Sequence, residues 1–93
     1  MIRSIRHKAL RRLFVEGEAR GMAPDLVVRL RILMSALHVA DNLDELASVP
    51  GWRLHKLKGD LRDHWSLSVS GSWRLIFRFS NGVADDVDLI DYH

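Results

Sequence analysis

The spacing of the apolar residues changes once along the chain, at Pro50-Gly51, and this change restricts the fold more than any other feature of the sequence. Before it, apolar residues recur every three or four positions, which is the spacing of a helix that buries one face. This spacing predicts helices over about 7–16 and 24–40, separated by a break that contains two glycines. One more helical turn is expected within 42–49.

After Pro50-Gly51, apolar and polar residues alternate, as they do in strands of a sheet with one buried face. The expected strands cover 52–57, 64–69, 73–79 and 83–92. Asn81-Gly82 favours a tight hairpin between the last two strands, because both residues tolerate a positive φ.

The predicted fold is α+β, with two N-terminal helices packed on one face of a mainly antiparallel C-terminal β-sheet. Residues 2–5 also alternate and are compatible with a further short strand. A chain of 93 residues is long enough for one small core and too short for two. Residues 1–93 are therefore expected to form a single domain.

The composition favours a cytoplasmic protein. The chain has no cysteine, and it has no apolar run long enough to span a membrane. Its first residues lack the continuous apolar segment of a signal peptide. We therefore expect a location in the cytoplasm and no membrane partner.

Basic residues are grouped although the net charge is only +2. Such local groups can bind a polyanion, although a basic helix surface is more often simply solvated. The group in the first third of the chain is of this ambiguous kind, and a second group lies in the predicted 52–57 strand and just after it. The members of the second group are Arg53, Lys56, Lys58 and Arg62.

The polar face of the predicted sheet carries two arginines on one strand, Arg74 and Arg78. They can either grip a phosphate or pair with Asp86 and Asp88 across the hairpin. We expect the ion pair for Arg78 and a functional role for Arg74.

His55 is a candidate for proton transfer, because histidine titrates near neutral pH and this one lies among basic residues. His93 is a second candidate. Cleavage of RNA through the 2′-hydroxyl requires groups that move protons and cations that stabilise a charged phosphorane. The other histidines, His7, His38 and His64, are interpreted as structural or surface residues.

Other classes of site find no support in the sequence. It contains no phosphate-binding P-loop, no dinucleotide-binding glycine pattern and no histidine spacing typical of a zinc enzyme. The apolar faces of the helices are needed to cover the sheet, which argues against a helix-turn-helix DNA reader. No cofactor or metal is expected.

Four stretches together resemble the HigB-type toxins of bacterial toxin–antitoxin systems, within the RelE superfamily of ribosome-dependent mRNA endonucleases. They are residues 2–10, the Gly-Trp-Arg-Leu-His-Lys-Leu-Lys-Gly-Asp segment at 51–60, the Trp-to-Phe segment at 65–79, and the terminal Asp91-Tyr92-His93. The resemblance spans nearly the whole chain. Many relatives have proline where this chain has Lys56.

This resemblance implies a small α+β toxin that enters the A site of the 30S ribosomal subunit and cuts mRNA there by metal-free attack of the substrate's own 2′-hydroxyl. It also implies a HigA-type helix-turn-helix antitoxin as partner. The chain would then contact DNA only indirectly, through this antitoxin. The implied catalytic residues are His55, Asp91, Tyr92 and His93. The expected RNA or phosphate contacts are Arg53, Lys56, Lys58 and Arg74.

A non-catalytic RNA- or ribosome-binding module is the alternative, because the same basic surface could bind RNA without cutting it. A pure binder does not require His55 together with Asp91-Tyr92-His93. That combination favours the nuclease.

Overall fold

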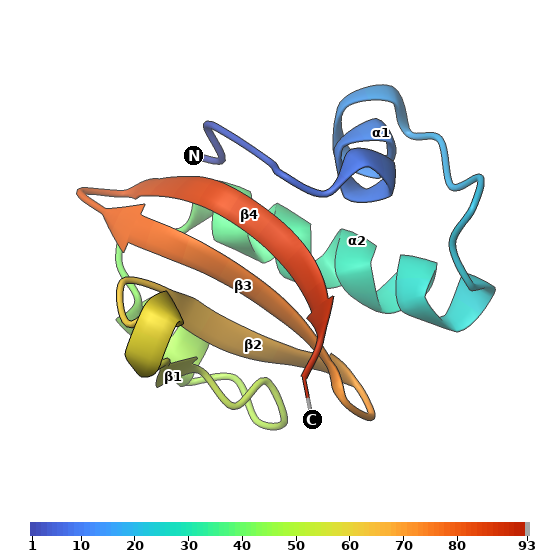
Figure 1. The fold of residues 1–93 in the computed structure, drawn as a ribbon. Coiled ribbons are helices and arrows are strands. Elements are labelled where there is room, and N and C mark those ends of the chain that lie inside the picture. Colours follow the sequence, from blue (N-terminus) through green and yellow to red (C-terminus); the bar gives the residue numbers. More distant parts are fainter. Residues whose placement is uncertain (93) are drawn as a thin grey trace.

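The computed structural model describes residues 1–92 of the chain. Within them, the α-helices precede the strands, as the change in apolar spacing predicts, and one 3-10 helix lies between the first two strands (Figure 1). The helices are α1 (Lys8–Glu16), α2 (Pro24–Val39), the single turn α3 (Asp44–Ala47) and the 3-10 helix η1 (Gly59–Leu61). The strands are β1 (His55–Lys56), β2 (Trp65–Ser70), β3 (Trp73–Ser80) and β4 (Val83–Asp91).

The four strands form one antiparallel sheet in the order β1-β2-β3-β4. The N-terminal arm, residues 1–6, lies along the free edge of β4, where Ile2 pairs with Ala84 and Ile5 with Val87 in a parallel sense. Figure 1 shows this blue arm beside the red final strand, with α2 crossing behind the sheet. The predicted α+β architecture, helices on one face of a mainly antiparallel sheet, is confirmed.

The core lies between α2 and the sheet. Helix α2 contributes a row of fully buried side chains that includes Leu30, Leu33 and Leu37. They face Leu75 and other buried residues of the central strands. Burial of a leucine of this kind contributes about 1.5–3 kcal/mol, so the face that the sequence marks as apolar is the face that holds the two layers together.

The expected hairpin turn and the expected break between the first two helices are also confirmed. Asn81 and Gly82 both have positive φ, at 51° and 76°, as a two-residue hairpin turn requires. Gly17 ends α1 with φ 70°, and Pro24 begins α2. His7 caps α1, because its Nδ1 accepts a hydrogen bond from the Leu10 amide at 3.1 Å.

The first strand is much shorter than the predicted 52–57. Arg53 has a φ of 51°, which interrupts the extended chain directly after Trp52. Trp52 turns into the core, and its carbonyl accepts a hydrogen bond from the Ser68 amide at 2.8 Å. Only His55 and Lys56 then pair regularly with β2.

The last strand contains an irregularity that simple alternation misses. The pairing of β3 with β4 shifts between Ile76 and Arg78, and Asp86 has a φ of 52° there. Strict alternation would place Asp85 on the buried face with Val87. The shift instead sets Asp85 opposite Arg78.

No helix within residues 1–92 has the length and apolar character needed to cross a bilayer.

Candidate active site

A small hollow at the edge of the sheet brings together four of the residues singled out from the sequence. It has a volume of about 210 Å³ and is referred to here as the His55 hollow. It is lined by His55, Lys56, Leu57, Lys58 and Tyr92. The hollow therefore joins the first strand to the end of the last one, two segments that are far apart in the sequence.

Strand register explains why these two segments share a face. His55 pairs with Ser66, Ser66 with Ile76, and Ile76 with Asp88, so the four residues form a line across the whole sheet. Directly paired residues project to the same face. His55 therefore points to the face of Asp88, which is opposite to the one that packs on the helices.

The end of β4 is held by the turn between β2 and β3. The Tyr92 amide donates a hydrogen bond to the Ser72 carbonyl at 2.8 Å, and the Ser72 hydroxyl donates one to the Asp91 carboxylate. Asp91 also pairs with Trp73 in the β3–β4 register. These contacts fix the segment that carries Tyr92, whose exposed fraction is 49%.

His55 is exposed, and its Nδ1 lies 3.3 Å from the carbonyl oxygen of Arg53. When Nδ1 carries the proton it donates to that carbonyl, and Nε2 is then the nitrogen that can accept a proton from a substrate. The backbone thus favours one tautomer of the ring. This is an arrangement that suits a general base.

The expected cations divide into two groups. Lys56 and Lys58 line the His55 hollow, whereas Arg53 and Arg74 are not among its lining residues. The Nη1 atom of Arg74 donates hydrogen bonds to the carbonyls of Gly71 (2.6 Å) and Trp73 (2.9 Å). The guanidinium is therefore bonded to the β2–β3 turn.

Arg78 forms the ion pair expected for it, with its Nη1 3.4 Å from Oδ2 of Asp86. Asp86 also lies 3.6 Å from Nε of Arg6, so its carboxylate is shared by two arginines. Nearby, Arg3 and Asp85 form a close ion pair. The hydrogen bond from Arg3 is the main cause that lowers the pKa of the Asp85 carboxyl below its ordinary value.

One residue of the site, Ser72, is not identified from the sequence. No sequence motif surrounds Ser72. Its role depends on the contact between its turn and the end of β4, which forms only in the folded chain. His93, in contrast, is expected to be catalytic but lies outside the described residues. Within residues 1–92, no three histidine, aspartate or glutamate side chains are placed to share a metal ion.

Known proteins resemble this chain in sequence and in fold. A family model for HigB-like toxins, described as RelE-like toxins of the type II toxin–antitoxin system HigB, matches residues 3–93. A curated protein named Endoribonuclease HigB, from Proteus vulgaris, is 38% identical over 93 residues, which is the full length of both chains.

Solved structures of YafQ from E. coli share the fold. One of them, a mutant of YafQ, has a TM-score of 0.58 and 16% sequence identity, over 95% of this chain and 87% of the other. Another, from strain BL21(DE3), has a TM-score of 0.55 and 14% identity over the same shares. At such low identity the likeness concerns the architecture alone.

Proposed function

The chain belongs to the HigB-like toxins, the RelE-like toxins of type II toxin–antitoxin systems, and we propose that it cuts messenger RNA in the ribosomal A site and so stops translation. The relative from Proteus vulgaris carries the name of an endoribonuclease and matches the whole chain. The His55 hollow is the observation that carries the proposal. It combines a histidine, two lysines and a tyrosine on one exposed surface.

The proposed reaction uses the 2′-hydroxyl of the RNA as nucleophile. A base takes the hydroxyl proton, the 2′-oxygen forms a bond to phosphorus, and the bond from phosphorus to the 5′-oxygen breaks. An acid gives a proton to that leaving oxygen, and the products are a 2′,3′-cyclic phosphate and a free 5′-hydroxyl. Each step needs only proton transfer and charge stabilisation, so protein side chains can perform it without a metal ion.

His55 and His93 are the proposed pair for proton transfer. Lys58 lines the hollow, and we assign it to stabilise the negative charge of the phosphorane. Tyr92 presents an exposed ring on which a base can stack. In this proposal the Asp91 carboxylate orients a histidine or stabilises its protonated, charged form.

We assign three further cations to binding of the RNA strand rather than to the reaction: Lys56, Arg53 and Arg74. Lys56 lines the hollow and can contact a phosphate directly. Arg53 is exposed and lies two residues before His55, the first residue that lines the hollow. Arg74, bonded to the β2–β3 turn, stands on the face of His55, because it pairs with Ser68 two positions from Ser66.

A type II system also contains an antitoxin, and we propose that it is a HigA-type helix-turn-helix protein. It would neutralise the toxin and repress their shared operon, so that the toxin meets DNA only through its partner. A toxin that acts on ribosomes works in the cytoplasm.

The test is cleavage of mRNA on programmed ribosomes by the wild-type protein and by His55→Ala and His93→Ala. Removal of a proton-transfer group is expected to slow cutting by about 10²–10⁴-fold. His38→Ala is the matched control, because this histidine accepts a backbone hydrogen bond from Ile2 on the helical side of the molecule. It should cut normally.

Near-normal cutting by both His55→Ala and His93→Ala would refute the catalytic assignment. A wild-type protein that binds ribosomes but leaves mRNA intact would instead identify a non-catalytic binding module. Thermal unfolding of every variant shows whether a loss of cutting reflects a loss of fold.

A further inference from the structure

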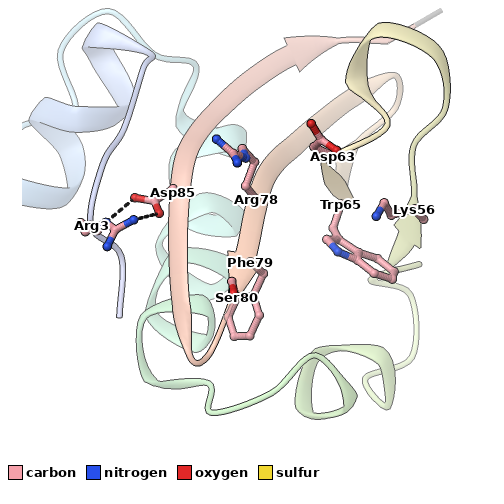
Figure 2. Close-up of a pocket in the computed structure, with 8 residues that line it drawn as sticks. All are labelled: Arg3, Lys56, Asp63, Trp65, Arg78, Phe79, Ser80 and Asp85. Carbon is pink, nitrogen blue, oxygen red and sulfur yellow. Dashed lines mark hydrogen bonds and ion pairs between the residues drawn. The ribbon is translucent and has the colours of Figure 1, made fainter.

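A larger pocket lies beside the His55 hollow, and we refer to it as the Trp65 pocket. Its volume is about 380 Å³, which is within the range of pockets that hold small organic ligands. It is lined by Arg3, Lys56, Asp63, Trp65, Arg78, Phe79, Ser80 and Asp85. Figure 2 shows Arg78 between the Arg3–Asp85 ion pair on one side and Trp65 with Lys56 on the other.

Lys56 connects the two cavities, because it lines both of them. The geometry of an edge strand explains this. His55 pairs with Ser66 and Lys56 with Trp65, so the two neighbours project to opposite sides of β1. The long lysine side chain at the sheet edge can reach both cavities, and a ligand that spans them would pass over Lys56.

The pocket offers aromatic surface together with this cation. Trp65 and Phe79 are only partly buried, although both pack against the core. The Nζ atom of Lys56 lies 5.2 Å from the centroid of the Trp65 ring. A nucleotide carries both groups that such a wall recognises, an aromatic base and a phosphate.

The charge around Arg78 is not fully balanced by its neighbours. Arg3, Arg6 and Arg78 share two carboxylates, those of Asp85 and Asp86. Arg3 and Asp85 are closely paired, so Arg6 and Arg78 both depend on Asp86. The side chain of Arg78 is 54% exposed and can donate hydrogen bonds to a phosphate as an additional partner.

Asp63 completes the pocket on the Lys56 side. Its carboxylate is an acceptor, which suits the exocyclic amino group of a base better than a further phosphate.

We propose that the Trp65 pocket binds a nucleotide of the RNA strand adjacent to the nucleotide held in the His55 hollow. The base stacks on the aromatic wall formed by Trp65 and Phe79, a phosphate contacts Arg78, and the strand crosses Lys56 between the two cavities. This inference rests on the proposed function, since it takes the His55 hollow as the place where RNA is cut.

The first experiment measures binding without cleavage. A fluorescein-labelled hexanucleotide with 2′-O-methyl groups at every position has no free 2′-hydroxyl and cannot be cut by the proposed reaction. Its affinity for the wild-type protein, Arg78→Met and Arg20→Met is measured by fluorescence anisotropy over a range of salt concentrations. Arg20, 84% exposed in the connection between α1 and α2, provides the same charge change away from the pocket.

Arg78→Met is expected to weaken binding at least threefold and to reduce the slope of log K against log salt by about 0.7, the value for one phosphate contact of a single strand. Arg20→Met should retain the wild-type slope. Equal slopes for Arg78→Met and wild type would overturn the proposal.

Tryptophan fluorescence provides a second measurement. Stacking of a base on Trp65 is expected to quench its emission when the hexanucleotide binds. Trp65→Phe should lose most of this quenching, whereas Trp73→Phe, which removes another partly buried tryptophan, should retain it. Identical quenching in both variants would overturn the proposal. The same titration with the antitoxin in place of the hexanucleotide tests a protein ligand, and quenching of Trp65 by the antitoxin but not by RNA would also overturn the proposal.

Failure of this inference can be distinguished from failure of the proposed function. If the wild type cuts mRNA and Arg78→Met binds and cuts equally well, the pocket is not a nucleotide site but the nuclease assignment stands. If binding depends on Arg78 and Trp65 but the wild type cuts no mRNA, the pocket is supported and the nuclease assignment fails.

Discussion

Ser72 bonds to Asp91 and Tyr92 at once, through its hydroxyl and its carbonyl. The turn between β2 and β3 therefore positions the end of β4, on which half of the proposed active site depends. Ser72 is not itself a lining residue of the His55 hollow. We assign it as a positioning residue.

Ser72→Ala should slow mRNA cutting by about tenfold, the effect expected from loss of one hydrogen bond to a charged group. Affinity for uncleavable RNA should change little, because the variant removes no group that touches RNA. Ser70→Ala, an exposed serine two positions earlier, is the matched control. The measurements are the single-turnover cutting rate and the Kd for RNA, and a parallel loss of both would argue against a positioning role.

Deletion of Tyr92 and His93 should abolish cutting and leave the fold intact. Tyr92 is about half exposed and is not part of the hydrophobic core. Circular dichroism and the urea midpoint of unfolding check the fold, and mRNA cleavage checks the activity. If the shortened chain unfolds, the end of β4 is a structural clasp and its assignment to the active site is wrong.

Arg53→Gly should separate stability from RNA binding. A left-handed conformation costs a residue with a Cβ atom about 1–2 kcal/mol, and Arg53 has a φ of 51°. Glycine removes that strain but has more freedom in the unfolded chain. We expect the free energy of unfolding to rise by about 0.5–1 kcal/mol and the affinity for RNA to fall.

Arg53→Asn tolerates the same φ and keeps a side chain, so it serves as the control for the backbone effect. Urea unfolding and RNA anisotropy are the two measurements. Unchanged RNA affinity in both variants would remove Arg53 from the proposed RNA path.

Stability should depend on pH through Asp85. The pKa of its carboxyl is lowered in the folded protein, chiefly by the hydrogen bond from Arg3, from an ordinary value of 3.8. A lowered folded pKa stabilises the fold above the unfolded pKa, and this stabilisation is lost as the pH falls through the folded value. Wild type should therefore be more stable than Asp85→Asn at pH 7, and the difference should shrink below about pH 3.8.

Urea midpoints of wild type and Asp85→Asn at pH 7, 5, 4 and 3 test this dependence. Asp60→Asn, which changes an exposed carboxylate in η1, controls for a general effect of charge. A difference between wild type and Asp85→Asn that stays constant over this range would contradict the role of the Arg3–Asp85 pair.

Local features of the fold could be predicted from the sequence because their causes lie within a few residues. The apolar stripe of α2 and the Asn81-Gly82 turn are of this kind. The shortened first strand and the shifted register at Asp86 could not be predicted, because both depend on how the chain packs after distant segments meet. A positive φ at Arg53 has no signal in the residue type, and aspartate adopts a positive φ too seldom for Asp86 to be singled out from the other aspartates of its strand.

The candidate site shows the same division. His55, Lys56 and Lys58 are near neighbours in the sequence, and Tyr92 reaches them through strand pairing that the alternation made predictable. Arg53 and Arg74 are not among the residues that line the hollow; the first has a left-handed backbone conformation and the second is bonded to a turn. The catalytic roles themselves stay predictions.

The N-terminal arm has a consequence for the order in which the molecule can form. Its bonds to β4 join residues more than 80 positions apart, such as Arg6 with Val87 and Ser4 with Asp86. Contacts that close such long loops form late in folding. A chain interrupted before residue 83 would lack the partner of the arm and also Tyr92, so a partly synthesised toxin could neither complete its sheet nor assemble the His55 hollow.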